Sequence, residues 1–187
     1  MKSARWVCVV VSFALGGAFA FGGTAGSAPR VGACDVLTTE ELNAALGSTF
    51  QPGTPYHAGT GTTCGYDGIG PVRGATVRVA RGKQAKVAMA TTLKALREIL
   101  KSVDSDPPVK VAGLGKKAYY SLDGFLDEGS IEVLDGKIFI QVTAIVAPDN
   151  DTALVSDAVL SGLAEKALVG AKLRSDQPRV RDGQLRR

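Results

Sequence analysis

The alternation of apolar and polar residues along the chain predicts five β-strands. The clearest alternation lies in 72–81. We also predict strands over 117–122, 130–134 and 137–146, the last two with imperfect alternation, and a shorter strand that starts at 64–67. Asp135-Gly136 stands between 130–134 and 137–146, and this dipeptide favours a tight hairpin with a type I′ turn. Glycine, proline and threonine dominate 49–63, which we therefore interpret as a loop.

Apolar residues at helical spacing predict a long helix over 83–101 and a final helix that starts near Asn150 and ends at Gly170. An earlier, shorter helix carries its own start and stop signals. Thr38 and Glu41 have the spacing of a capping box, Leu37 and Leu42 that of a hydrophobic staple, and Gly47 is placed to end the helix. A helix this short is not stable alone, so it must depend on tertiary packing.

The order of these elements predicts an α+β domain: a helix, two strands, the long helix, three strands and a final helix. Strands that follow one another through tight turns pair antiparallel, and helices cover the apolar face of the sheet. We therefore expect an antiparallel sheet of about five strands with the helices packed on one face, which makes a two-layer domain.

Phe139 and Ile145 fall on the face of their strand opposite to Ile138 and Ile140. If the helices cover only one face of the sheet, Phe139 and Ile145 need a partner from a loop, a second subunit or a ligand. These two residues are therefore our candidate for a binding face.

The amino-terminal segment, residues 1–27, has the layout of a secretory signal peptide. Lys2 and Arg5 precede an apolar run, and small residues follow it. Cleavage fits after Ala20 or, as we favour, after Ser27, and an uncleaved signal anchor is the alternative. No later stretch of the sequence is long and apolar enough to span a bilayer. We therefore expect a secreted or cell-envelope protein.

The formal net charge of +4 comes from outside the predicted single domain, which covers 28–174. Of the 22 Lys and Arg residues, two lie in the signal peptide and four in the tail at 175–187. The tail also holds two of the 18 Asp and Glu residues, so the domain carries 16 charges of each sign. A neutral domain argues against nucleic acid as a partner, and we expect the basic tail to be disordered.

Cys34 and Cys64 are the only cysteines outside the amino-terminal apolar segment. In an oxidising compartment two such residues are expected to form a disulfide. Closing a loop of about 30 residues would stabilise the domain by about 3–4 kcal/mol. Lipidation of Cys34 is the alternative, because Val31-Gly32-Ala33-Cys34 loosely matches a lipobox, although Arg30 separates this motif from the apolar run.

Three short motifs follow one another along the predicted domain. They are Cys34-x-Val36-Leu37-Thr38 continuing to Gly47, then Cys64-x-Tyr66, and then Val111-Ala112-Gly113-Leu114-Gly115 continuing to Tyr119. In this order and spacing they resemble a domain-of-unknown-function family found in exported proteins and lipoproteins of actinobacteria, including mycobacteria. The resemblance covers nearly the whole mature domain. It implies an α+β sheet fold in the cell envelope, a paired Cys34 and Cys64, and no catalytic residues.

Many members of that family carry a lipidated cysteine well before the paired ones. This chain has only Cys8 in that region, deep in the apolar run. The usual lipid anchor of the family is therefore expected to be missing.

No residues stand in a pattern that predicts a catalytic, cofactor or metal site. Cys34, His57 and Cys64 are too few ligands for structural zinc, and a bridged cysteine has no thiolate to act as a nucleophile. A serine hydrolase would need a Gly-x-Ser-x-Gly elbow, which the sequence lacks. Gly113–Lys117 lacks the spacing of a phosphate-binding loop.

Asp123, Asp127 and Glu128 match no calcium-binding EF-hand loop. We therefore expect a non-catalytic envelope protein that binds a small or lipidic ligand, or another envelope protein, without a cofactor or metal. A small secreted hydrolase is the alternative, because a pair of carboxylates can serve acid–base chemistry without any linear motif.

Overall fold

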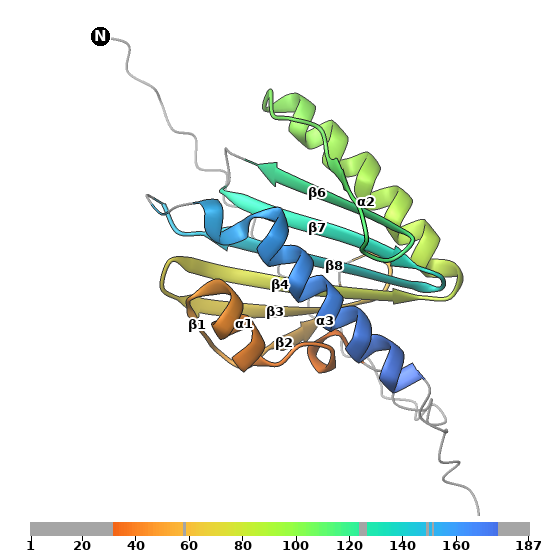
Figure 1. The fold of residues 1–187 in the computed structure, drawn as a ribbon, viewed down its shortest axis with the longest axis horizontal. Coiled ribbons are helices and arrows are strands. Elements are labelled where there is room, and N and C mark those ends of the chain that lie inside the picture. The colour runs from red at the N-terminus through yellow and green to blue at the C-terminus, as the bar shows by residue number, and fades with distance from the viewer. Residues whose placement is uncertain (1–31, 58, 124–126, 149, 151, 176–187) are drawn as a thin grey trace, which may run out of the picture.

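The computed structural model describes residues 32–57, 59–123, 127–148, 150 and 152–175. The predicted signal peptide and the tail beyond Ser175 lie outside these residues. Figure 1 shows one twisted sheet with helices packed against it. Among the helices that the structure describes, none combines the length and the apolar character needed to cross a membrane.

Eight strands form one antiparallel sheet across the described residues. From edge to edge the order is β1-β3-β4-β8-β7-β6-β5, and β2 also pairs with β3. The strands are Thr49–Phe50 (β1), Thr54–Tyr56 (β2), Thr62–Ile69 (β3), Val72–Arg81 (β4), Val109–Val111 (β5), Lys117–Asp123 (β6), Glu128–Asp135 (β7) and Ile138–Val146 (β8).

The prediction of an antiparallel α+β fold is confirmed, but five strands are too few. β1, β2 and β5 have only two or three residues each. Segments this short show no alternation to recognise, and β1 and β2 lie within the stretch that we interpreted as a loop. Each of them pairs at an edge of the sheet and shortens the backbone left open there.

Three α-helices pack against this sheet: α1 (Thr39–Leu46), α2 (Lys83–Ser102) and α3 (Asp157–Ser175). Two short 3-10 helices precede α1 and α3, namely η1 (Ala33–Asp35) and η2 (Thr152–Val155). The α1 cap is as predicted, because Thr38 Oγ1 accepts from the Glu41 N–H at 3.2 Å and Glu41 Oε2 accepts from the Thr38 N–H at 2.9 Å. Gly47 follows with a left-handed φ of 64°.

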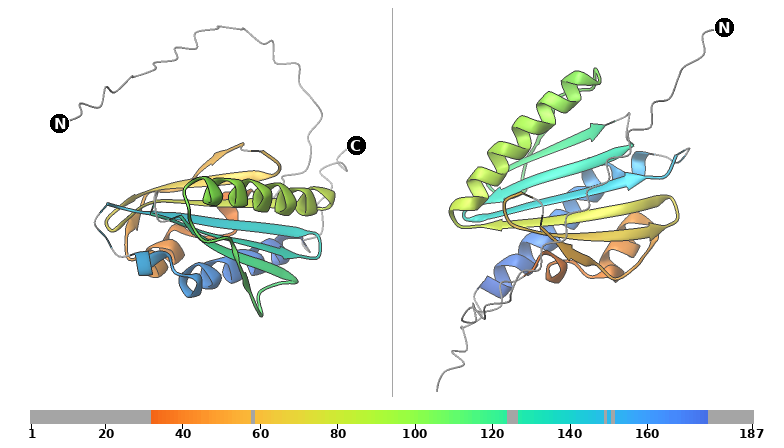
Figure 2. Two further views of the ribbon diagram at one scale, coloured as in Figure 1. Left: turned by 90° about the horizontal axis from the view of Figure 1, so that it is seen from above. Right: turned by 180° about the vertical axis from the view of Figure 1, so that it is seen from behind.

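The helices lie on both faces of the sheet, so the domain has three layers. α1 and α3 cover one face, and α2 lies across the other, as the view from above in Figure 2 shows. The larger core lies between the sheet and α1 with α3, and it includes Leu42, Val77, Val142 and Leu163. The prediction that all helices share one face is therefore wrong.

Phe139 shows why the second layer of helix is needed. It is completely buried in a smaller core with Met89 and Leu93 of α2, and Ala80 of β4 lies opposite it in the sheet. α2 supplies the partner that we expected from a loop, a subunit or a ligand, so Phe139 forms no exposed binding face. Ile145 lies on the same face of β8 and is only partly buried.

Two local predictions about glycine are corrected. Asp135 pairs with Ile138, so Gly136 and Lys137 are the central residues of the turn. Only Gly136 of these two has positive φ, at 60°, which is the pattern of a type II′ turn and not of type I′. α3 does not end at Gly170 but continues to Ser175.

Gly170 is needed for packing and not for helix termination. A Cβ atom at Gly170 would lie 2.8 Å from the backbone oxygen of Val36. Glycine at this position therefore lets α3 approach the segment between η1 and α1 closely.

The predicted disulfide between Cys34 and Cys64 is present, with Cα atoms 5.0 Å apart. It joins η1 to the first half of β3, where Cys64 is fully buried. Two residues further along β3, the Tyr66 hydroxyl donates to the backbone oxygen of Leu37 at 3.2 Å. The bridge uses the Cys34 sulfur that a lipid would require, so lipidation of Cys34 is incompatible with this arrangement.

Candidate functional site

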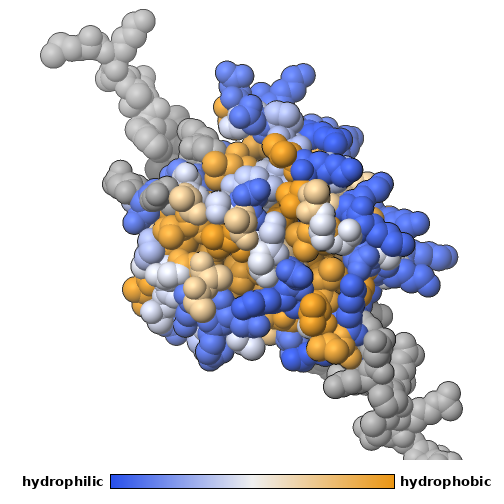
Figure 3. Space-filling model, viewed as in Figure 1, coloured by the Kyte–Doolittle hydropathy of each residue, from blue (hydrophilic) through white to orange (hydrophobic). Residues whose placement is uncertain are grey.

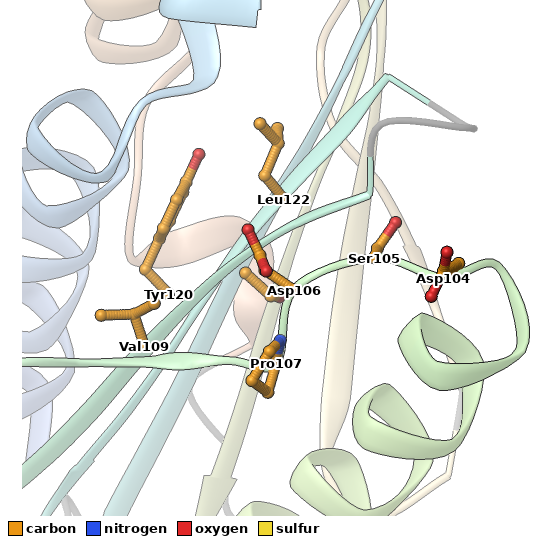
Figure 4. A pocket seen from close by; sticks show the side chains of 8 residues that line it. Asp104, Ser105, Asp106, Pro107, Val109, Tyr120 and Leu122 are labelled. Carbon is orange, nitrogen blue, oxygen red and sulfur yellow. The ribbon is translucent and has the colours of Figure 1, made fainter.

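The edge of the sheet at β6 borders an open cleft of about 460 Å³ (Figure 4). The loop after α2, the start of β5 and the middle of β6 contribute its walls. The lining residues are Asp104, Ser105, Asp106, Pro107, Val109, Tyr120, Ser121 and Leu122.

The end of α2 positions the acidic side of this cleft. Asp104 adopts a left-handed φ of 56°, and the Ser105 N–H then donates to the backbone oxygen of Leu100 at 2.8 Å. This is the closing bond of a Schellman motif, with aspartate where glycine is common. The motif ends the helix and turns the chain, so that Asp104 and Asp106 lie beside β6 and are exposed.

Two consecutive prolines explain why the edge of β6 stays open at the cleft. β5 pairs with β6 only from Val109 opposite Tyr120 to Val111 opposite Ala118. Pro107 and Pro108 precede Val109, and proline has no backbone N–H to donate to a neighbouring strand. The β5–β6 ladder therefore stops before Ser121, and the cleft occupies the place where it would have continued.

The cleft walls combine apolar and polar surface. Tyr120 and Leu122 point to the α3 side of the sheet, where the Tyr120 hydroxyl donates to the backbone oxygen of Val155 at 3.1 Å. Val109, opposite Tyr120, is 62% exposed. Ser121 points to the α2 side, because successive residues of a strand face opposite sides. A ligand in this cleft would contact both faces of the edge strand.

A buried polar cluster lies directly behind Ser121. In the sheet register Ser121 pairs with Ser130 of β7. The Ser130 hydroxyl donates to Oε1 of Glu132 at 2.5 Å and lies 3.1 Å from Oγ1 of Thr143. Nε2 of Gln141 also donates to Oε1 of Glu132, at 3.2 Å. Both bonds reach the same carboxylate oxygen.

Glu132 has no solvent-exposed surface, and its second oxygen, Oε2, has no hydrogen-bond partner in the structure. Tyr119, its partner on β6, and Leu134, two residues later on β7, both pack against the small core beneath α2. The Glu132 carboxylate therefore lies under this helix. Burial raises the pKa of Glu132 to about 7, although the hydrogen bonds from Ser130 and Gln141 act in the opposite direction.

Two further carboxylates stand next to this cluster. Asp123 at the end of β6 pairs directly with Glu128 at the start of β7. Burial, and then the charge of Asp123, raise the pKa of Glu128, and the charge of Glu128 adds to the rise at Glu132. The acidic groups at this corner therefore repel one another in a poorly hydrated environment.

The nearest guanidinium group in the same row of the sheet does not neutralise Glu132. Arg78 of β4 pairs in register with Gln141, which stands between it and Glu132. Its hydrogen bonds go to the backbone oxygen and hydroxyl of Thr60, both at 2.9 Å, and to Thr92 of α2 at 3.4 Å. It also lies 5.9 Å from the ring centroid of Phe139. Arg78 thus ties β4 to α2 and to the loop before β3.

The residues weighed in the sequence occupy other places. Cys34 and Cys64 are joined in the disulfide, and His57 is exposed just after β2. Phe139 and Ile145 do not reach the cleft lining. Within the described ranges, no group of three or more His, Cys, Asp or Glu side chains is placed to hold a metal ion.

Sequence reasoning did not identify Glu132 or the cleft. A signal for Glu132 was available, because it is an acidic residue between Ile131 and Val133 in an apolar strand. We expected a loop, a second subunit or a ligand on this face, because we assigned all helices to the other side of the sheet, and we did not consider Glu132. The loop residues Asp104 and Asp106 looked like an ordinary helix end, since nothing local indicates that they turn back onto β6.

Comparison of the chain with protein-family models, with curated proteins and with solved structures finds no match. The resemblance to the actinobacterial envelope family therefore stays a prediction, and the site itself must support any statement about function.

Proposed function

We propose that this protein is a non-catalytic binding module of the cell envelope, and that a small ligand with an apolar portion occupies the cleft beside β6. The observation that carries the proposal is the cleft itself, a concavity of about 460 Å³ with Val109, Tyr120 and Leu122 on one side and polar groups on the other. Small-molecule sites typically combine apolar walls with a few fixed polar groups in this way.

The compartment is supported by the disulfide and the amino-terminal sequence. The Cys34–Cys64 bridge fits an oxidising environment outside the cytoplasm. The signal-peptide pattern at 1–27 points in the same direction. A ligand encountered there, such as an envelope lipid or another amphiphile, would bring the apolar portion that the cleft walls can bury.

A hydrolase remains the second candidate because of one observation, the raised pKa of Glu132, which suits a general acid or base. Two features favour binding instead. Glu132 is fully buried and is not among the residues that line the cleft. General acid–base catalysis needs its group within hydrogen-bond reach of the substrate, directly or through one water. Turnover of an ester, glycoside or peptide panel that is lost in Glu132→Gln would replace the binding proposal.

The proposal can be tested with a neutral amphiphile and methyl-detected NMR on the exported protein, purified with its disulfide intact. Decyl maltoside, titrated below its micelle concentration, should shift the methyl signals of Val109 and Leu122. Val109→Ser should weaken this binding, whereas Val87→Ser should not. Val87 is a matched control because it lies on α2 and is 55% exposed, close to the 62% of Val109.

The experiment also separates the cleft from other apolar surface. Figure 3, viewed from the side of α1 and α3, shows apolar patches among polar residues on this face. Near the end of α3, Val169 and Leu173 are exposed. Shifts centred on Val169 and Leu173 instead of on Val109 would place the binding surface on α3 and contradict a ligand site in the cleft.

A further inference from the structure

We infer that the cleft selects ligands with a positive charge, so that its natural ligand is an organic cation such as an amine or guanidinium compound with an apolar body. The inference rests on the proposed function and specifies the ligand class of the same site.

The charged side chains that line the cleft are both acidic. Asp104 and Asp106 stand on the loop side, and no Lys, Arg or His is among the lining residues. Both aspartates are exposed, so they remain available to a ligand. Val109, Tyr120 and Leu122 form the apolar wall, and Figure 4 shows Asp106 on the loop that faces Tyr120 and Leu122. This arrangement complements a molecule with one cationic end and one apolar end.

The wall at Ser121 separates the cleft from more negative charge. Ser121 and Ser130 are direct cross-strand partners, whose Cβ atoms lie roughly 4.5–5.5 Å apart in such a pair. Ser130 in turn donates a hydrogen bond to Glu132. Glu128 lies two residues before Ser130 on the same face of β7. These carboxylates need not touch a ligand to attract it, because charges interact strongly where water is excluded.

The ion pairs of the described residues lie elsewhere in the fold. Among the described residues, the ion pairs within 4.0 Å join Lys94 with Glu98, Lys172 with Asp135, and Arg174 with Asp35. None of these pairs involves Asp104, Asp106, Glu128 or Glu132. The basic residues of α2 are all exposed and project away from its buried side: Lys83, Lys86, Lys94, Arg97 and Lys101.

The open oxygen of Glu132 gives the inference a pH signature. The charged and titratable groups on the same face near Glu132 are Tyr119 and Asp123 on β6, Glu128 on β7 and Arg78 on β4. The buried side chains of α2 that cover this face are all uncharged: Ala85, Ala88, Met89, Leu93 and Leu100. A cation in the cleft favours ionised Glu132, so cation binding should strengthen as pH rises through about 7.

The test uses three probes that share a decyl chain and carry a fixed charge or none: decyltrimethylammonium, decyl maltoside and decyl sulfate. Each is titrated into the full exported protein and followed through the Val109 and Leu122 methyl signals. We expect the cation to bind at least about tenfold more tightly than the neutral probe at pH 8, and the anion to bind most weakly. The preference should shrink in salt, because exposed carboxylates contribute to it.

Two variants assign the preference to named groups. Asp104→Asn combined with Asp106→Asn should remove most of the preference for the cation, whereas Asp67→Asn should keep it. Asp67 is a suitable control because it is also exposed but lies on β3 at the opposite side of the sheet. In Glu132→Gln, the increase in cation affinity between pH 5.5 and pH 8 should fall by at least half.

The outcomes separate this inference from the proposed function. If all three probes bind equally well, the charge preference is overturned and the apolar cleft stands. If the neutral and anionic probes bind more tightly than the cation, the ligand class is wrong. If no probe shifts Val109 or Leu122, the proposed function fails first, and the inference fails with it. If the affinity for the cation changes with pH in Glu132→Gln as it does in the wild type, Glu132 does not contribute to the charge preference.

Discussion

The Ser130 hydroxyl donates a hydrogen bond of 2.5 Å to Oε1 of Glu132, two positions further along β7. Residues two apart on a strand face the same side, so both side chains lie in the layer between the sheet and α2. Ser130 also stands opposite Ser121, which lines the cleft. The pair therefore connects an open surface site to an acidic group in the interior of the domain.

The first prediction concerns the pH dependence of stability. The folded-state pKa of Glu132, about 7, lies above its ordinary value of 4.5, so the folded protein holds this proton more tightly than the unfolded chain. The resulting stabilisation is complete below pH 4.5 and is lost as pH rises through 7, with a magnitude on the order of 3 kcal/mol. Urea unfolding should therefore show a lower free energy of unfolding at pH 8 than at pH 5.

Glu132→Gln should remove most of this difference between pH 5 and pH 8. Glu98→Gln is the control, because Glu98 is an exposed residue on α2 that should leave the pH profile unchanged. The pKa of Glu128 is also raised, so some dependence of the unfolding free energy on pH should remain in this variant. If the free energy of unfolding of the wild-type protein does not change between pH 5 and pH 8, the pKa of Glu132 is not raised by burial.

The second prediction tests the layer formed by α2. Phe139→Ala should lower the free energy of unfolding by about 3–5 kcal/mol, because it leaves a cavity between β8 and the helix. Ile69→Ala should change it by less than about 0.5 kcal/mol, since Ile69 is 70% exposed. Denaturant unfolding measures both. A small effect at Phe139 would mean that α2 does not pack on this face of the sheet.

The third prediction concerns the disulfide. Replacing Cys34 and Cys64 together by alanine should reduce stability by about 2–5 kcal/mol, because the unfolded chain is no longer constrained by the closed loop. The double variant avoids the free thiol that a single replacement would leave. Thermal unfolding of this variant should match that of the reduced wild-type protein, and equal stability of the oxidised wild type and the variant would rule out a structural role for the bridge.

The fourth prediction sets the carboxyl-terminal limit of the domain. A chain that stops after Ser175 should melt at the same temperature as the full mature chain, since the apolar contacts of α3 lie before this point. A chain that stops after Gly170 should melt several degrees lower. It loses Ala171, which is fully buried, and Lys172, which pairs with Asp135 at 2.6 Å. If the chain that stops after Ser175 melts at a lower temperature than the full mature chain, residues 176–187 stabilise the fold.

Local sequence signals were sufficient for much of the secondary structure. Val72–Arg81 alternates from Ala75 to Val79 and forms β4 with the predicted limits, and the capping pair Thr38 and Glu41 marks the start of α1. The pairing of Cys34 with Cys64 followed from their number and the expected compartment. These features depend on residues close in the chain or on a choice with few alternatives, so they need no knowledge of the packing.

The three-layer arrangement and the site were decided by tertiary structure. The nearly continuous apolar run in 138–146 indicates a strand with two apolar faces, but it does not say which element covers each face. Only the packed sheet sets α2 over Phe139 and brings Gly170 against Val36. Register likewise places Ser121 of one strand beside Ser130 of another, and the turn after α2 carries Asp104 to the same edge. The sequence by itself thus determined the longer helices and strands and the disulfide, whereas the short edge strands, the cleft and the buried Glu132 exist only where distant segments meet.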